Sequence, residues 1–395
     1  MSVTLSDALE LVVRLFLLFN VLAVLALSLV WLERKELGRL QGRVGPTRVG
    51  PFGLLQPLAD GLKLLMKEDI APGSSVRLIF FVAPLLVFVP AFVVWVTIPF
   101  AGDLVVRNLE LGLFFFVSVS VLSIVGLVLA GWSSNSKYAI LGSFRSAAQL
   151  VSYEIPIIMT ILVVAILAGS LDFVAVVDAQ ASVPYVAIVP LAFVIFLIAG
   201  LAEVGRTPFD IYLAESEVVG GPFVEYSGAH WAIFFLAEYV NTFLVGVLGA
   251  LLFLGGWRWP FDDPPQLAAL ALLLGKSYLI VVVIFWVRAT YPRMRIDQLM
   301  SFGWKWLIPL SFAAVVTTAV QMFYGWPQWT LTLMSLGILA VPIYLQLRLQ
   351  GKPARALARH YAEIAVLVEA KPRPEPEPEE EPEAATGPAP EGASA

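Results

Sequence analysis

Apolar runs of about 20 residues recur along most of the chain and constrain its fold more than any other feature. A helix of that length crosses the roughly 30 Å hydrocarbon core of a bilayer. Of the 395 residues, 59 % are hydrophobic and only 14 % are charged, so lipid is the main solvent of this chain. We expect an all-α, polytopic membrane protein with eight or nine transmembrane helices, near residues 10–32, 77–100, 112–132, 147–170, 184–203, 229–256, 266–288, 306–324 and 329–348.

The last two of these spans come from one uncharged run, residues 307–347. This run is too long for a single crossing, and Gly325-Trp326-Pro327 interrupts it with a turn that carries an interfacial tryptophan. The sequence does not decide whether the ninth segment crosses the membrane completely.

The positions of the basic residues predict the orientation. Most of the 25 Lys and Arg residues fall in the loops after the odd-numbered spans and in the tail. By the positive-inside rule, the N-terminus is outside and the C-terminus is cytoplasmic in the inner (plasma) membrane. Residues 1–350 then form the transmembrane domain. Residues 351–395 form a cytoplasmic tail, which should be disordered from about residue 371 because it is rich in Pro, Glu and Ala.

The chain has no cysteine and only two histidines, His230 and His360. Thiolate-held iron–sulfur clusters, disulfides and a bis-histidine haem are therefore excluded, and we expect no metal site. No glycine-rich nucleotide-binding motif is recognisable, and no nucleic-acid partner is expected. Any redox centre must belong to partner subunits.

Residues 52–69, in the loop after the first span, predict an amphipathic helix that lies in the membrane interface. Its polar side contains Asp60, Lys63 and Lys67. It either anchors the loop or walls the mouth of a cavity that is open to lipid. The apolar residues with helical spacing are Leu54, Leu55, Leu58, Leu62, Leu65 and Met66.

A second cytoplasmic loop, residues 203–228, is acidic where basic residues are the rule. We call it the acidic loop. Its five carboxylates surround a single arginine: Glu203, Arg206, Asp210, Glu215, Glu217 and Glu225.

Three ionisable residues lie within the predicted spans, where each costs about 3 kcal/mol to insert. Helical rise places Glu238 and Lys276 near the middle of the membrane, where they could pair, and Glu154 closer to the cytoplasm. With the acidic loop and with Glu33 and Glu36 at the end of the first span, they form a series suited to proton relay. The alternative is a set of buried ion pairs that hold helices in register.

Several motifs, spread from about Glu33 to Leu310, together resemble one family. They are GPTRVGPFGLLQPLADGLKLLMKED, AGWSSNSKYAILGSFRSAAQLVSYE, RTPFD with AESE and EYSG, FFLAEY, and YPRMRIDQLMSFGWKWLIPL. The chain is similar to the subunit 1 family of respiratory complex I, whose bacterial members are the H subunits of the proton-translocating NADH-quinone oxidoreductase.

The resemblance implies a membrane subunit at the junction with the peripheral arm, where it forms the quinone entrance and much of the quinone chamber. Its partners would be other subunits of both arms, membrane lipid and a quinone, either ubiquinone or menaquinone. FMN and iron–sulfur clusters would belong to partner subunits. The chain would then be one subunit of a translocase that couples quinone reduction to proton translocation, with no complete active site of its own.

This interpretation gives three groups of candidate residues. The proton relay comprises Glu154, Glu203, Arg206, Asp210, Glu215, Glu217, Glu225, Glu238 and Lys276. The quinone entrance comprises Glu33, Glu36, Arg43, Arg48, Asp60 and Lys63. A docking surface for the peripheral arm, which could instead be a simple positive-inside anchor, comprises Arg288, Arg293, Arg295 and Asp297.

Two departures from the family pattern affect the acidic loop. Ile211-Tyr212-Leu213 stands where Leu-Pro-Glu is usual, so Leu213 carries no proton, and Val204-Gly205 replaces a polar pair. Two other functions are weighed: the equivalent subunit of an energy-converting hydrogenase, and a stand-alone secondary transporter. A transporter predicts inverted repeats, and none is apparent in the sequence.

Overall fold

The computed structural model describes residues 5–102, 104–261, 264–342 and 344, and the expected tail, 351–395, lies outside them. Residues Met1–Ala340 belong to one compact unit. All regular elements among the described residues are helical, so the predicted all-α class is confirmed.

Seven helical segments of the described chain are long and apolar enough to cross a membrane. Two shorter apolar helices, α9 (Pro190–Glu203) and the helix Gln328–Pro342, match the other two predicted spans. The seven are α1 (Leu5–Leu40), α3 (Arg77–Val93), α4 (Gly112–Ser120) with α5 (Leu122–Ser133), α6 (Lys137–Ala168), α11 (Gly228–Phe253), α12 (Gln266–Thr290), and α13 (Ile296–Phe302) continuing through a π-helical turn, Gly303–Leu307, into α14 (Ile308–Tyr324).

The structure corrects several of the predicted boundaries. The first helix continues to Leu40, beyond residue 32, and the eighth segment begins at Ile296, not near residue 306. The helix of the fourth span begins at Lys137, not near residue 147, because the stretch from Lys137 to Arg145, which holds these two charged residues, is already helical. The fifth is broken into α8 (Tyr185–Ile188) and α9, since Val189, which precedes Pro190, has non-helical backbone angles. A short helix, α7 (Phe173–Ala179), precedes this break.

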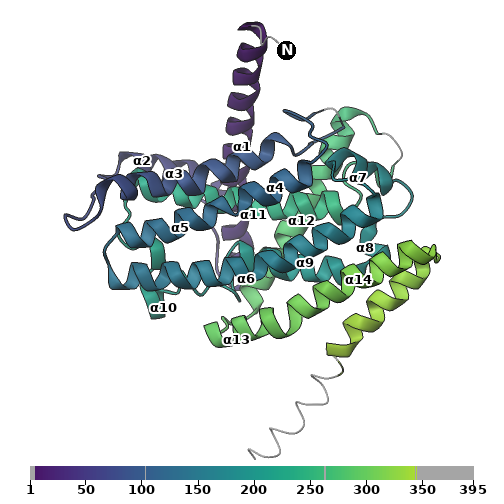
Figure 1. Cartoon of the computed structure of the whole chain (residues 1–395). Helices are drawn as coiled ribbons and strands as arrows, with labels where there is room; N and C mark the ends of the chain where they lie inside the picture. Colours follow the sequence, from purple (N-terminus) through teal and green to yellow (C-terminus); the bar gives the residue numbers. More distant parts are fainter. Residues whose placement is uncertain (1–4, 103, 262–263, 343, 345–395) are drawn as a thin grey trace, which may run out of the picture. The chain divides into compact units, whose positions relative to one another are not determined.

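Helix α11 lies at the centre of the helix packing. It contacts α12, α3 and α1, while α6 contacts α5, α9 and α14. Every residue from Thr242 to Phe253 of α11 is buried. In Figure 1, α3, α5, α6, α9 and α14 run side by side, whereas α1 crosses them and its N-terminal part projects beyond them. Polar side chains in the middle of α11 are therefore surrounded by protein and not by lipid.

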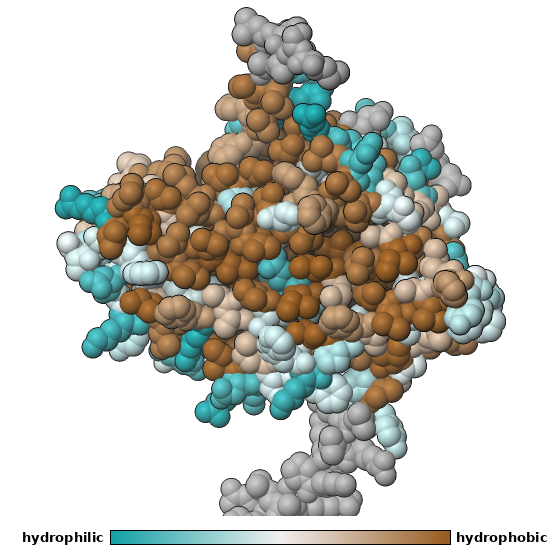
Figure 2. All heavy atoms as spheres, in the orientation of Figure 1, coloured by the Kyte–Doolittle hydropathy of each residue, from teal (hydrophilic) through white to brown (hydrophobic). Residues whose placement is uncertain are grey.

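The outer surface of these helices is apolar. Figure 2 shows hydrophobic residues over most of the visible face, and hydrophilic residues mainly along its margins. Exposed apolar side chains of α3 and α4 include Leu85, Val89 and Phe114. An apolar surface of this extent suits lipid or neighbouring membrane subunits.

The predicted interfacial helix is present as α2 (Gln56–Met66). It is shorter than the predicted 52–69, because Phe52 and Gly53 have positive φ angles and Lys67 is extended. Leu58, Leu62 and Leu65 are exposed, as expected for a helix lying in a lipid interface.

The acidic loop folds back against α6. It contains α10 (Glu215–Val218) and a short 3₁₀ turn, Gly221–Phe223. A Cβ atom on Gly142 would lie 2.4 Å from the Gly221 Cα, and Gly221 itself has a φ of +59°. The loop can therefore approach α6 only where both positions lack a side chain.

We predict that Gly142→Ala destabilises the protein by about 1–3 kcal/mol, since its methyl group meets backbone that cannot yield cheaply. Thermal unfolding in detergent should show a lower midpoint. The control is Gly275→Ala on α12, where a Cβ meets nothing within 4 Å. Equal midpoints for the two variants would show that the loop is not packed against α6 in this way.

Candidate functional site

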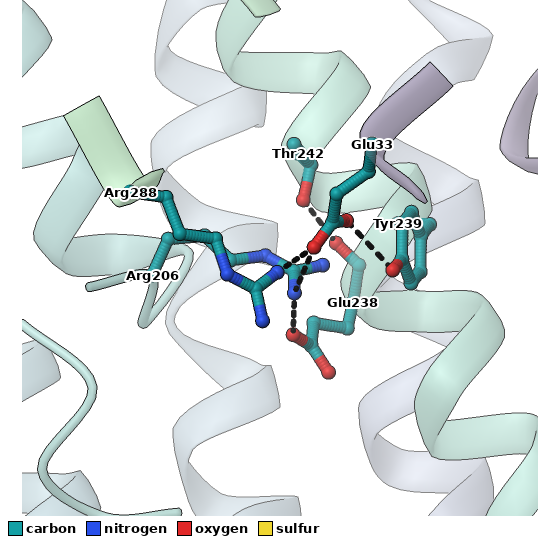
Figure 3. Close-up of polar contacts among 6 residues, drawn as sticks. All are labelled: Glu33, Arg206, Glu238, Tyr239, Thr242 and Arg288. Carbon is teal, nitrogen blue, oxygen red and sulfur yellow. Dashed lines mark hydrogen bonds and ion pairs between the residues drawn. The ribbon is translucent and has the colours of Figure 1, made fainter. Parts of the chain in front are cut away.

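A cluster of buried charged side chains lies between α1, α11, α12 and the acidic loop (Figure 3). Nη1 of Arg206 lies 3.1 Å from Oε1 of Glu238 and 3.7 Å from Oε1 of Glu33. Arg288 also forms an ion pair with Glu33. The hydroxyl of Tyr239 donates a hydrogen bond of 2.7 Å to Oε2 of Glu33. We call these five residues the charge cluster.

The charge cluster is balanced in formal charge, with two arginines and two glutamates. Glu33 is 3 % exposed and Arg206 is 6 % exposed, so both have lost most of their hydration. Burial alone lowers the pKa of Arg206, but Glu238, Tyr239 and Tyr212 outweigh it and the pKa is raised. Arg206 thus stays cationic, and its Nε and Nη2 have no hydrogen-bond partner among the described residues.

A cavity of about 470 Å³ opens between α1, α2 and α11. Its wall is mostly apolar, and the aromatic side chains of Trp231, Phe235 and Tyr239 follow one another along α11. Tyr239 lines this cavity and also donates to Glu33, so the inner end of the cavity borders the charge cluster. We call it the entrance cavity.

Asp60 joins the interfacial helix α2 to α1 at the rim of the entrance cavity. Its carboxylate accepts a hydrogen bond of 2.6 Å from Nη1 of Arg34 and one of 3.2 Å from Nε2 of Gln56. The ammonium of Lys63 lies 3.6 Å away. Partial burial raises the pKa of Asp60, but the hydrogen bonds and the positive charges of Arg34 and Lys63 outweigh burial and lower it overall. Asp60 is therefore an anion at neutral pH.

Two smaller cavities, of about 50 Å³ each, lie deeper among the helices. Glu238 and Tyr212 line one, which we call the Glu238 cavity. Glu154 lines the other, the Glu154 cavity, where it accepts a hydrogen bond of 3.4 Å from Ser120. Glu203 lines both cavities, and its Oε2 has no hydrogen-bond partner among the described residues.

Asp210 is the half-buried carboxylate of the acidic loop. Burial raises the pKa of Asp210, and the negative charge of Glu215 raises it further. The positive charges of Arg293 and Arg206 lower it, but burial outweighs them and the pKa lies above its usual value. Burial likewise raises the pKa of Tyr212, which remains a neutral hydroxyl. Asp210 can therefore hold a proton at a higher pH than an exposed aspartate can.

The other acids of the loop lie nearer the surface. Glu215 and Glu217 are exposed, and Glu225 is half-buried. Glu217 forms an ion pair with Arg145 of α6. The structure thus separates these outer carboxylates from Glu203, Asp210 and Glu238.

The expected pair between Glu238 and Lys276 is wrong, since Glu238 contacts Arg206 instead. Nζ of Lys276 donates to the carbonyl oxygens of Leu254, Gly256 and Trp259 at 2.7, 2.6 and 2.5 Å. These carbonyls follow the C-terminal end of α11, where a cation is favourable. The lysine side chain extends toward that end, away from the charge cluster.

Several entrance and docking residues also lie elsewhere than expected. Glu33 is part of the charge cluster and not of the cavity wall, and Glu36 has a buried Oε2 without a described partner. Arg43 and Arg48 are exposed and do not line the entrance cavity. Arg288 points inward to Glu33, whereas the other three docking residues, Arg293, Arg295 and Asp297, are exposed.

Sequence reasoning missed Arg34 and Tyr239. Arg34 directly follows Glu33, and Tyr239 directly follows Glu238. Neither donor bonds to the glutamate that it follows, since Arg34 pairs with Asp60 and Tyr239 donates to Glu33, and successive side chains of a helix point in different directions. The sequence therefore held no direct signal for either contact.

Comparison with known proteins gives a consistent result. A family model described as NADH dehydrogenase matches residues 13–319. The H subunit of NADH-quinone oxidoreductase from Dehalococcoides mccartyi is 45 % identical over 329 residues, covering 83 % of this chain and 92 % of that protein. The H subunit from Geobacillus kaustophilus is 50 % identical over 289 residues, covering 73 % and 86 %.

The resemblance of the motifs from Glu33 to Leu310 is thereby confirmed. The chain belongs to the family of H subunits of NADH-quinone oxidoreductase, and it is one membrane subunit of an oxidoreductase complex.

Proposed function

We propose that this subunit forms the quinone entrance and part of the quinone chamber, and that it couples quinone reduction to proton translocation. The observation that carries the proposal is the entrance cavity, which is lined both by the interfacial helix α2 and by Tyr239, a member of the charge cluster. A lipid-soluble substrate and a charge-sensitive group are thus close together.

The chemistry of the entrance cavity suits a quinone. Its wall is mostly apolar, as an isoprenoid tail requires, and the few polar groups at its rim include Arg34, Asp60 and Lys63. The same features fit ubiquinone or menaquinone. Electrons would come from partner subunits that hold FMN and iron–sulfur clusters, so this chain supplies binding and proton handling.

Coupling would start from a change of charge beside the cluster. A quinone that gains electrons becomes an anion or takes up protons, and either event changes the balance between Arg206 and its two carboxylates. Glu238 could then exchange a proton through the Glu238 cavity with Glu203, and Glu203 through the Glu154 cavity with Glu154. The acidic loop, Asp210 above all, would connect this route to the cytoplasm.

The loop after α12 would dock the peripheral arm on the cytoplasmic side of the inner membrane. Nη2 of Arg293 donates to Oγ of Ser216 in the acidic loop at 3.4 Å, so acidic and basic surfaces adjoin. Arg295 and Asp297 are exposed beside them and can contact a partner of mixed charge. This orientation places the N-terminus outside.

The first prediction concerns the rim of the entrance cavity. Asp60→Ala removes the ion pair with Arg34. Because the Arg34 side chain is half exposed, this ion pair is worth about 0.2–1 kcal/mol. We expect the KM for quinone to rise by up to about fivefold, with NADH oxidation by a soluble acceptor unchanged. Glu68→Ala, an exposed carboxylate just beyond α2, is the control. Equal loss of both activities in Asp60→Ala would indicate failed assembly and not an altered entrance.

The second prediction concerns the buried carboxylate of α11. Glu238→Gln keeps the shape of the side chain and its ability to accept a hydrogen bond from Arg206, but it removes a titrating group. We expect assembly and quinone binding to persist while proton pumping per NADH oxidised is lost. Asp178→Asn, at a carboxylate paired with Arg258 away from the charge cluster, is the control and should pump normally. A normal proton yield in Glu238→Gln would leave Glu238 as a structural ion-pair partner only.

The third prediction concerns docking. Arg295→Glu reverses an exposed charge and should weaken attachment of the peripheral arm, with the largest difference from the wild type at low salt, because salt screens exposed charges. Native gels of membranes solubilised over a series of salt concentrations measure this. Arg107→Glu, exposed in a loop after an even-numbered span, is the matched control. If the arm stays attached equally in both variants, Arg295 serves only as a basic anchor.

A further inference from the structure

Asn241 is a polar residue in the interior of α11, one helical turn after Glu238. Its amide has no hydrogen-bond partner among the described residues, although it lies in a helix that packs against α3 and α12. By contrast, Asn20 on α1 donates to the carbonyl of Phe16 in its own helix at 2.7 Å. The side chain is half-buried and lines a cavity, so water there can supply the hydrogen bonds that the protein does not.

Asn241 lines both the Glu238 cavity and the Glu154 cavity. Three other residues line both: Ser123 of α5, Glu203 of α9 and the apolar Val204. Three polar groups from three helices therefore surround the junction of the two cavities. Glu238 faces only one of the cavities and Glu154 only the other, so any connection between them passes these groups.

Water fits this junction in both size and chemistry. Each cavity has about 50 Å³, and one water molecule needs roughly 10–15 Å³ measured in this way. Much of the surrounding wall is apolar, including Leu127, Leu150 and Leu244. Buried water is retained where it has two to four polar partners, and here the amide, the Ser123 hydroxyl and the Glu203 carboxylate supply them.

The amide of Asn241 can both donate and accept, so it can hold a water molecule in either orientation. The hydroxyl of Ser123 donates to the carbonyl of Ser120 at 2.8 Å, which leaves its oxygen free to accept from water. Neither side chain titrates near neutral pH. Both can therefore position water without becoming charged themselves.

We propose that Asn241, with Ser123, binds water at the junction of the Glu238 and Glu154 cavities, and that this water carries protons past Glu203. The water accepts a proton from one carboxylic acid and releases another proton to the next carboxylate, so it is unchanged and one proton has moved. Asn241 is a positioning residue in this scheme. The inference rests on the proposed function, since it completes the route from Glu238 to Glu154.

The test uses the intact complex with Asn241→Leu, which has a similar shape but holds no water, and Asn241→Ser, which is polar and leaves room for an additional water molecule. We expect at least a tenfold loss of proton pumping in Asn241→Leu, with NADH oxidation by a soluble acceptor unchanged, and substantial recovery in Asn241→Ser. Thr318→Val, which removes a buried hydroxyl bonded to its own helix in α14, is the control and should pump normally.

A structural readout separates this inference from the proposed function. High-resolution cryo-electron microscopy should show water density beside Asn241 in the wild type and Asn241→Ser. Absence of that density in the wild type, or normal pumping in Asn241→Leu, overturns the inference. If Asn241→Leu fails to assemble, pumping by Asn241→Ser is the test: pumping near the wild-type level supports the inference, and loss of pumping overturns it. Normal pumping in Glu238→Gln would instead overturn the relay itself.

Discussion

The contact of Arg206 with Glu33 and Glu238 constrains much of this structure. It joins α1, α11 and the acidic loop, three parts that are far apart in the sequence. Removal of one partner from a buried ion pair typically costs 3–5 kcal/mol, because the remaining charge has neither water nor a counter-ion. The three parts are therefore held in register by a contact that could not survive at the lipid surface. The entrance cavity and the Glu238 cavity adjoin this contact, through Tyr239 and Glu238 respectively.

The entrance cavity lies beside this contact, so a molecule bound in the cavity would be close to Arg206 and its carboxylates. Tyr239 belongs to both, since it lines the cavity, donates to Glu33 and lies with its ring 4.7 Å from Cζ of Arg206. A new negative charge in the cavity would compete with Glu33 and Glu238 for the same guanidinium. Arg206 has two nitrogen atoms without described partners, so it can respond to such a charge without first breaking its contacts.

The length of the apolar runs predicted the membrane helices well because lipid imposes a minimum length on each crossing. Helical rise also predicted the depth of Glu238 in the membrane, but depth does not determine which neighbours its side chain contacts. Glu238 and Lys276 were placed at similar heights, yet the direction in which each side chain points depends on helix rotation and neighbours. The sequence did not predict Arg206 as the partner of Glu238, because Arg206 lies in a loop and its position cannot be calculated from helical rise. Asn241 escaped notice for another reason: an uncharged amide in a helix carries little insertion cost and no clear sequence signal.

The choice of basic residues also bears on which groups can move protons. Arginine keeps its charge in nearly every protein environment, so Arg206 and Arg288 act as fixed cations. Lys276 donates to three carbonyl oxygens, which uses every N–H of its ammonium group and stabilises the end of α11. Cations that are fixed or saturated leave proton exchange to the carboxylates. Of these, Glu154, Glu203 and Glu238 line the small cavities, where the proposed water would reach them, whereas Glu217 forms an ion pair with Arg145 at the surface. A proton route through this subunit is therefore best sought between α11, α9 and α6, from Glu238 through Glu203 to Glu154.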